Sequence, residues 1–384
     1  MEHYVASRAK AIPPFLAMEV LERAQALERA GRSIIHLSLG EPDFPTPPVV
    51  VEAAFRALRE QRTRYTHSLG LLELREAIAA HYGAAYGVDV SPEQIMVTCG
   101  TSPAMLLLFA ALLDPGDEVI LPNPHYACYP QMIEFAGGRP VYVEVDEADG
   151  FQLRVEAVAK SISPRTKAIF INSPANPTGT VLEPSVLEGI AELGPPVVSD
   201  EIYHRLVYSG AEHTLLQYNS NAFVLNGFSK AYAMTGWRIG YLIAPLAFIR
   251  TLQKMHQNFF ISASDFVQWA AIAALTEAGD DVARMREAFD ERRRYLVPAL
   301  RSLGFGIHAE PTGAFYVLAN ARHWSEDSLK FAFDILEHAG VAVTPGIDFG
   351  SAAEGYIRFT YANSLENLRE AVARLGRFLD ERGP

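Results

Sequence analysis

A lysine and an arginine stand eight positions apart among small residues in the segment Asn226-Gly-Phe-Ser-Lys-Ala-Tyr-Ala-Met-Thr-Gly-Trp-Arg-Ile-Gly240. A lysine in a partly desolvated site loses its charge more readily, so the Lys230 amine could act as a nucleophile and form a Schiff base. Arg238 would offer a planar fork of donors to phosphate oxygens, with the Ser229 hydroxyl beside it. The alternative is a surface lysine in a loop before a strand, so the interpretation depends on residues upstream.

A carboxylate at the end of a strand is the second element. Asp200 follows the apolar run at 196–198, and ligands of open parallel sheets bind at the carboxyl ends of the strands. An ionised Asp200 paired with a pyridine nitrogen would keep that nitrogen protonated and make the ring an electron sink. Tyr203 could reach the neighbouring ring oxygen. The alternative for Asp200 is a helix N-cap, a position that aspartate favours.

An asparagine before a proline follows another apolar strand, in the segment Ile171-Asn-Ser-Pro-Ala-Asn-Pro-Thr-Gly179. Residues before proline are pushed to extended conformations, so Asn176 would be presented stiffly and could bond the same ring oxygen as Tyr203. A plain turn is the alternative. Together the three segments favour a site for a phosphorylated, pyridine-like cofactor.

Further motifs occur with these three in an order that covers nearly the whole chain: Ser38-Leu-Gly-Glu-Pro-Asp-Phe44, Tyr65-Thr-His-Ser-Leu-Gly70, Glu73-Leu-Arg75 and Tyr356-Ile-Arg-Phe359. In this the chain resembles the fold type I aminotransferases that use pyridoxal 5′-phosphate, in the class I subgroup of aspartate and aromatic aminotransferases. The resemblance implies that Lys230 carries the cofactor and that Asp200 pairs with the pyridine nitrogen. It implies that Asn176 and Tyr203 bond the ring oxygen, and that Arg238 and Ser229 bind the phosphate.

The resemblance extends to a phosphate-binding helix start and a stacking aromatic. Thr101 and Ser102 follow a β-like run and a glycine and open a long apolar helical stretch, where free N–H groups and the helix dipole attract an anion. A simple N-cap is compatible with that role. Tyr126 aligns with the aromatic residue that stacks on the cofactor ring, although it could be a core aromatic, the interpretation that we prefer for Tyr129.

The resemblance also assigns a substrate arginine and a residue shared between subunits. Arg358 aligns with the arginine that holds the α-carboxylate of the substrate in a bidentate pair, with the Gly40 backbone and Asn176 beside it. The alternative is an exposed charge on an edge strand. Tyr65 aligns with a tyrosine that reaches the cofactor phosphate of the partner subunit, which implies a homodimer with shared active sites.

The reaction that the resemblance implies is transfer of an amino group from an L-amino acid to a 2-oxo acid by a ping-pong mechanism, with 2-oxoglutarate as the expected acceptor. Lys230 would serve as general acid and base. The same scaffold supports β- or γ-elimination by a lyase, which stays open as an alternative, and a non-enzymatic ligand sensor is a further one. The donor amino acid is not assigned, because no motif supplies a second cation for a dicarboxylic side chain.

Several residues are candidates for reading the substrate side chain. A second carboxylate could be bound by Arg8, Lys10 or His125, although a surface or loop position explains each of them equally. An apolar side chain could instead meet Ile12 and Phe15, if the N-terminal segment closes over the pocket.

Composition is typical of a cytoplasmic enzyme. The chain has 384 residues, of which 49% are hydrophobic, and a formal net charge of -12. An acidic surface argues against nucleic acid or an anionic membrane as a partner. Two cysteines, Cys99 and Cys128, predict neither a disulfide framework nor a metal site.

The elements that must position these residues alternate along the chain. Helices are expected at 48–61 and 71–86, and strands at 95–99, 118–122, 140–145, 167–172, 196–200, 223–227 and 238–244. This order predicts an α/β fold with a mainly parallel seven-stranded sheet covered by helices. Short strands near 305–310, 314–318 and 356–361 and a final helix from Ser364 predict a smaller α/β domain. We therefore expect a large cofactor-binding domain at 46–280 and a discontinuous small domain made of 1–45 and 281–384.

Overall fold

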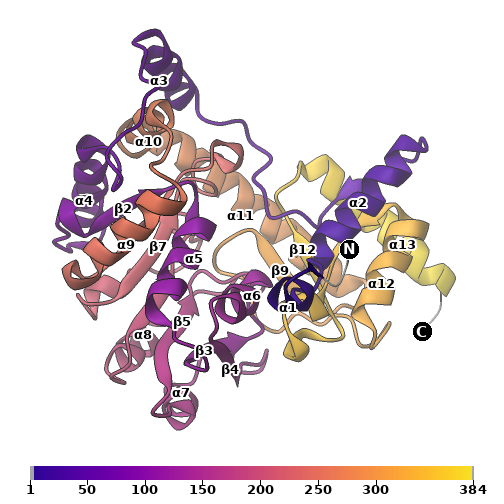
Figure 1. The fold of residues 1–384 in the computed structure, drawn as a ribbon. Coiled ribbons are helices and arrows are strands. Elements are labelled where there is room, and N and C mark those ends of the chain that lie inside the picture. The colour runs from indigo at the N-terminus through magenta and orange to yellow at the C-terminus, as the bar shows by residue number, and fades with distance from the viewer. Residues whose placement is uncertain (1–3, 383–384) are drawn as a thin grey trace.

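The computed structural model describes residues 4–382, and its largest element is a seven-stranded sheet (Figure 1). Its strands lie in the order β2 (Ile95–Thr98), β8 (Gly240–Ile243), β7 (Phe223–Gly227), β6 (Val197–Asp200), β5 (Thr166–Asn172), β3 (Glu118–Asn123) and β4 (Arg139–Glu144). All neighbours from β7 to β4 are parallel, whereas β8 is antiparallel to both of its neighbours. The predicted mainly parallel sheet is confirmed.

Helices cover both faces of this sheet because its strands are apolar on both sides. In β5, Ala168 and Phe170 pack on one face, and Ile169 and Ile171 pack on the other. The first face is covered by α5 (Thr101–Leu112), α6 (Cys128–Phe135) and α9 (Leu246–Phe259). The second is covered by α4 (Leu72–Tyr86), α7 (Val155–Ser161), α8 (Pro184–Ala191) and α10 (Asp265–Glu277), with α3 (Pro48–Arg59) packed on α10.

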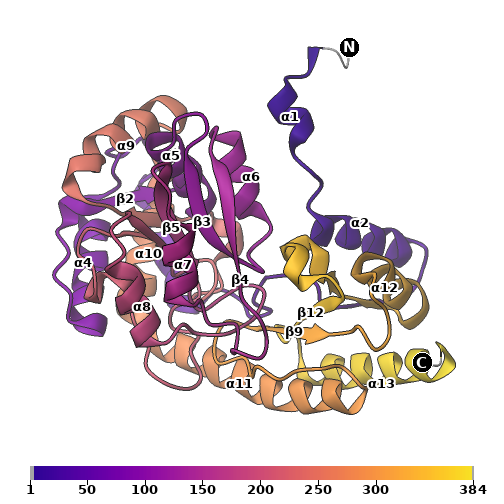
Figure 2. The ribbon, with the colours of Figure 1, turned by 90° about the horizontal axis from the view of Figure 1, so that it is seen from below.

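A smaller layer of strands lies beside the large sheet. It contains an antiparallel sheet in the order β11 (Thr344–Pro345), β12 (Tyr356–Thr360) and β9 (Tyr316–Asn320), and a parallel pair of β1 (Ile35–His36) with β10 (Val341–Ala342). Its helices are α2 (Leu16–Arg29), α11 (Gly279–Ser302), α12 (Ser328–Asp334, extended by a π-helical turn, Ile335–Ala339) and α13 (Leu365–Arg382). In Figure 2 α11 and α13 run side by side, while α1 (Ser7–Ala11) projects away and has no buried residue. The first and last parts of the chain therefore pack together.

Two strand predictions need correction. The strand expected at 305–310 is wrong, because only Gly306 pairs there, in a single bridge to Asn320. The strand expected from 238 begins at Gly240, because Arg238 has a left-handed backbone with φ of 56° that cannot continue a ladder. None of the helices within residues 4–382 is long and apolar enough to cross a membrane.

Candidate active site

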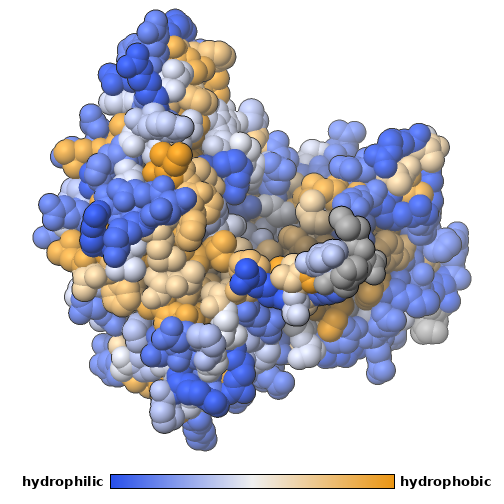
Figure 3. Space-filling model, viewed as in Figure 1, coloured by the Kyte–Doolittle hydropathy of each residue, from blue (hydrophilic) through white to orange (hydrophobic). Residues whose placement is uncertain are grey.

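A cavity of about 270 Å³ opens at the carboxyl ends of the central strands, where the large sheet meets the smaller layer. Figure 3 shows the hollow on this face, between the part with the large sheet and the part with α2. The structure brings eleven of the predicted site residues to its lining: Gly40, Thr101, Ser102, Tyr126, Asn176, Asp200, Tyr203, Ser229, Lys230, Arg238 and Arg358. Tyr65 does not line it.

Asp200 ends β6 and is buried at the floor of the cavity. One carboxylate oxygen accepts a hydrogen bond from the Tyr129 hydroxyl at 2.8 Å, and the other accepts the Ile202 amide at 3.2 Å. Burial raises the pKa of Asp200 to about 6. Residues 202–205 form a turn rather than a helix, so Asp200 is not the cap of a helix. Its charge is available to a cation in the cavity.

Lys230 follows β7 and points its amine at the segment after β1. The amine donates to the carbonyl oxygen of Gly40. Burial lowers the pKa of Lys230 to about 8, although the nearby Glu41 carboxylate opposes this and the cations of Arg358 and Arg238 add to it. An amine with a pKa this close to neutrality is deprotonated often enough to act as a nucleophile or base.

Arg358 lies in β12, the central strand of the three-stranded sheet, and is buried. Its guanidinium donates to Asn176 Oδ1 at 2.8 Å, to Thr344 Oγ1 at 3.1 Å and to the Ser38 carbonyl oxygen. Its Nε has no hydrogen-bond partner within residues 4–382. Because β12 is paired on both sides, the prediction of an exposed charge on an edge strand is excluded.

The Tyr316 side chain, which the sequence analysis did not single out, organises this end of the cavity. Its hydroxyl pairs with that of Tyr203 at 2.8 Å, and its ring lies 4.4 Å from the guanidinium of Arg358. A Cβ atom at Gly40 would collide with the same hydroxyl, so only glycine fits there. Tyr316 begins β9, and its position beside Tyr203 depends on chain pairing 113 residues apart.

The opposite end of the cavity is built for an anion. Gly100, with a φ of 100°, precedes α5, and no side chain caps the first turn, so the amides at Thr101 and Ser102 face the cavity end of the helix. A Cβ at Gly100 would lie 2.6 Å from the Arg238 guanidinium. Glycine therefore lets this cation approach the helix start, and the buried Ser229 adds a hydroxyl. Amides, a guanidinium and a hydroxyl together match a phosphate.

Tyr126 and Tyr65 have opposite environments. Tyr126 lines the cavity and makes edge contacts with Tyr129 and Phe15, at ring-centroid distances of 5.3 and 6.1 Å. Tyr65 is 81% exposed. Its neighbour Thr66 donates its amide to Ser262, which holds the loop, and Tyr65 does not line the cavity of its own chain.

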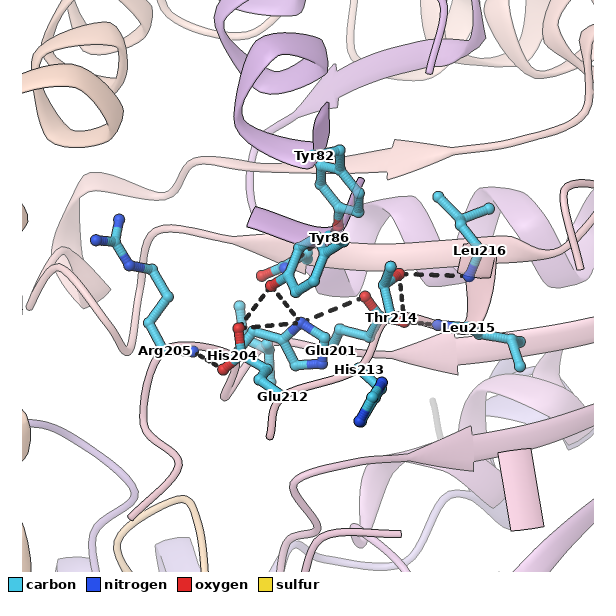
Figure 4. Close-up of polar contacts among 12 residues, drawn as sticks. Tyr82, Tyr86, Glu201, His204, Arg205, Glu212, His213, Thr214, Leu215 and Leu216 are labelled. Atoms are coloured by element: carbon cyan, nitrogen blue, oxygen red, sulfur yellow. Dashed lines mark hydrogen bonds and ion pairs between the residues drawn. The ribbon is translucent and has the colours of Figure 1, made fainter. Parts of the chain in front are cut away.

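A buried polar network supports the turn that follows Asp200 (Figure 4). Glu201, 1% exposed, accepts hydrogen bonds from the Leu215 amide at 2.9 Å and the Thr214 hydroxyl at 3.1 Å. Its second oxygen lies 3.5 Å from Nδ1 of His204. The turn between Asp200 and His204 is thus tied to the loop at 214–215.

The same network continues to α4 (Figure 4). The Tyr86 hydroxyl pairs with His204 Nδ1 at 2.8 Å and donates to Glu212 at 2.6 Å. This network was not predicted from the sequence, because its members are far apart in the chain and the resemblance gives no role to Glu201, which stands between Asp200 and Tyr203. Within residues 4–382, no group of His, Cys, Asp and Glu side chains could hold a metal ion.

Comparison with known proteins agrees with this geometry. Residues 32–375 match the family model for aminotransferase class I and II. The aspartate/prephenate aminotransferase of Thermus thermophilus is 43% identical, over 97% of this chain and 98% of its own length. The (5-formylfuran-3-yl)methyl phosphate transaminase of Methanocaldococcus jannaschii is 41% identical, over 96% and 97%. The solved structure of the aspartate aminotransferase from Thermus thermophilus with maleate has a TM-score of 0.94 and 42% identity, over 98% and 99%.

All three of these proteins are named as aminotransferases or transaminases, which favours transamination over the lyase alternative. The similarity extends over nearly the full length of the chain, so it includes both the large sheet and the smaller layer. From the family match and the near-complete similarity, this chain belongs to the class I and II aminotransferases of fold type I, which depend on pyridoxal 5′-phosphate.

Proposed function

We propose that this enzyme uses the cavity at Lys230 to transfer the amino group of an L-amino acid to a 2-oxo acid in two half-reactions. The observation that carries the proposal is that Lys230, Asp200 and Arg358 line one cavity together with the uncapped start of α5 at Thr101 and Ser102. Amino-group transfer requires a base, an anion that pairs with the ring nitrogen of the cofactor, and a cation that binds the carboxylate of the substrate.

Pyridoxal 5′-phosphate fits the donors and acceptors of the cavity. Its phosphate would be bound by the amides and hydroxyls of Thr101 and Ser102 with Ser229 and Arg238. Asp200 would hold its ring nitrogen, Tyr203 and Asn176 its ring oxygen, and Tyr126 its face. When bound, the cofactor supplies a ring that accepts electrons from the α-carbon of the substrate.

The surroundings of Arg358, Lys230 and Asp200 suit each of these residues to its proposed role. The guanidinium of Arg358 lines the cavity and is fixed by its hydrogen bonds to Asn176 and Thr344, which favours a bidentate pair with the α-carboxylate of the substrate. Lys230 would bind the cofactor and later move the proton at the α-carbon, a role that its lowered pKa supports. Asp200, kept in place by Tyr129, would hold a proton on the ring nitrogen.

A homodimer with shared active sites is part of the proposal. Tyr65 is exposed together with other large apolar side chains: Phe55, Leu58, Leu72, Phe259 and Ile261. Hydrophobic surface gathers on the face of the large-sheet part in Figure 3. Such side chains on neighbouring loops and helices are typical of a surface that another chain covers.

The proposal includes the division of the chain and its location. We infer a large cofactor-binding domain at 46–280 and a small domain made of 1–45 and 281–384. The pairing of β1 with β10, which joins the first part of the chain to the last, supports this division. We place the enzyme in the cytoplasm, where its free thiols Cys99 and Cys128 would stay reduced.

Half-reactions test the function. Purified enzyme with bound cofactor should convert one equivalent of an amino acid to its 2-oxo acid, with a change in the cofactor absorbance that a second 2-oxo acid reverses. Continuous release of ammonia without an acceptor would show a lyase instead.

Mixed dimers test the shared site. Lys230→Ala and Tyr65→Ala variants should each be inactive at limiting cofactor. Refolded together, they should recover about a quarter of wild-type activity, because half of the randomly paired dimers contain one intact site of two. Verified mixed dimers without recovery would show that Tyr65 serves its own subunit.

A further inference from the structure

We propose that the substrate side chain is aromatic or large and apolar, and that it lies against a wall of the cavity held in place by Asp348. We call this the N-terminal wall, and it is formed by Phe15, Ala17, Met18 and Leu39. The proposal rests on the proposed function and names the substrate class of that site.

The cations of the cavity leave no partner for a second carboxylate. Among the residues that the structure describes, three cationic side chains line it, namely Lys230, Arg238 and Arg358. The proposed function uses Lys230 for the cofactor, Arg238 for the phosphate and Arg358 for the α-carboxylate. A dicarboxylic donor or acceptor, including the 2-oxoglutarate expected from the sequence, would therefore place its second charge beside groups of this chain that offer it no counter-ion, which is costly.

Arg8, Lys10 and His125, the side chains that the sequence suggested for a second carboxylate, do not supply the missing counter-ion. Arg8 and Lys10 lie on α1, are exposed and do not line the cavity. His125 lines a neighbouring cavity of about 570 Å³, and burial lowers its pKa to about 4, so it is neutral at physiological pH. The sequence-based suggestion that these three could read a carboxylate gains no support.

The N-terminal wall presents carbon atoms where a substrate side chain would lie. Phe15 meets Tyr126 edge to face, with ring centroids 6.1 Å apart and an interplanar angle of 85°. Met18 is 43% exposed and supplies a flexible, polarisable surface. Ile12, which the sequence also suggested, lines the neighbouring cavity instead. Of these two predicted apolar contacts, only Phe15 is therefore in position.

Asp348 holds the N-terminal wall. Its carboxylate accepts the amides of Leu16 at 3.0 Å and Ala17 at 3.1 Å, the first two residues of α2. Phe15, at the N-cap position, has no side-chain acceptor for these amides, so Asp348 caps the helix from 332 residues away. The next residue, Phe349, packs 4.7 Å from the Arg358 guanidinium. The turn at Asp348 and Phe349 thus connects the N-terminal wall to Arg358, which is proposed to bind the α-carboxylate.

Two unreactive acids test the substrate class by binding alone. Calorimetry of the enzyme with bound cofactor should give 3-phenylpropanoate a Kd at least about tenfold lower than that of succinate, because both offer one carboxylate to Arg358 and differ at the other end. A lower Kd for succinate would overturn the proposal, since a cation from this chain or from the partner subunit would then reach the cavity. Failure of every amino acid to react would count against the proposed function instead.

Paired variants test the N-terminal wall and its tether. Phe15→Ala should weaken 3-phenylpropanoate about tenfold and succinate less than about twofold, whereas the neighbouring Ile12→Ala should leave both Kd values unchanged. Asp348→Ala should produce the same selective loss, and Ser364→Ala, which removes a cap of α13, should not. If Asp348→Ala folds poorly, Asp348→Asn should show a smaller loss of the same kind. Equal losses for both acids, or none for 3-phenylpropanoate, would contradict the role of Asp348.

Discussion

The floor and the N-terminal wall of the cavity are held in different ways. We define the floor as Asp200, Tyr203 and Lys230, which follow β6 and β7 of the large sheet. The N-terminal wall belongs to a segment tied through two amide hydrogen bonds to Asp348.

A buried polar network holds the floor, whereas the N-terminal wall is held at one end by its hydrogen bonds to Asp348. Below the floor, Glu201, His204 and Tyr86 form a buried polar network that ties the turn after β6 to α4. The wall begins beside α1, which buries no residue. Groups that bind a cofactor and move protons need positions fixed within fractions of an ångström, but an apolar contact tolerates more variation. This division would allow substrate preference to change through the N-terminal segment while the chemistry stays intact.

The largest effect is expected at the floor, from Lys230→Ala. Transamination should fall by about four powers of ten or more, because the variant loses both the group that binds the cofactor and the base. Cofactor absorbance and circular dichroism would show bound cofactor without the lysine linkage in a folded protein. Near wild-type turnover of the purified variant would contradict the assignment of the floor.

A smaller loss of turnover, about two to three powers of ten, is expected for Asp200→Asn, which keeps the shape and removes the charge.

The same variant should flatten the pH dependence of apoenzyme stability. Burial raises the pKa of Asp200 to about 6, so the folded wild type binds a proton more readily than the unfolded chain and loses stability as pH rises from about 4 to 6. Chemical unfolding at pH 4 and pH 7 would measure this difference, and an unchanged slope would contradict it.

Arg358→Lys tests the boundary between floor and wall. Lysine keeps the charge but loses the two-point fork, so kcat/KM should fall about a hundredfold for aromatic, aliphatic and acidic donors alike. A loss confined to acidic donors would instead make Arg358 a reader of the side chain, which the proposed wall excludes.

The smallest effect is expected from Glu201→Gln, which weakens the network beneath the floor. We expect kcat to fall about tenfold with little change in KM, because the turn that carries Tyr203 loses the carboxylate that lies 3.5 Å from His204 Nδ1. Substrate preference between phenylalanine and aspartate should stay the same. A changed preference would mean that floor and wall are not independent.

Local sequence was sufficient for the large sheet and for most of the lining of the cavity. The strand predicted at 223–227 has the observed bounds of β7, and its apolar start at 223–225 fits a strand that is buried on both faces. Lys230, Asp200 and Asn176 each follow such a strand, so the order of the elements brings them to one edge. Sequence pattern failed at 305–310, where apolar residues pack without forming a ladder.

Tertiary structure alone decided which partners hold these residues. Tyr129 was interpreted as a core aromatic and is buried, but its hydroxyl also binds Asp200, 71 residues later. Tyr316 meets Tyr203, and Asp348 caps α2, over separations of 113 and 332 residues. Hydrogen bonds of this kind leave no periodic trace in the chain, because each requires two surfaces that meet only when the sheets have packed. The sequence by itself determined which residues line the floor, because they follow its apolar strands, and packing determined how the floor and the wall are held.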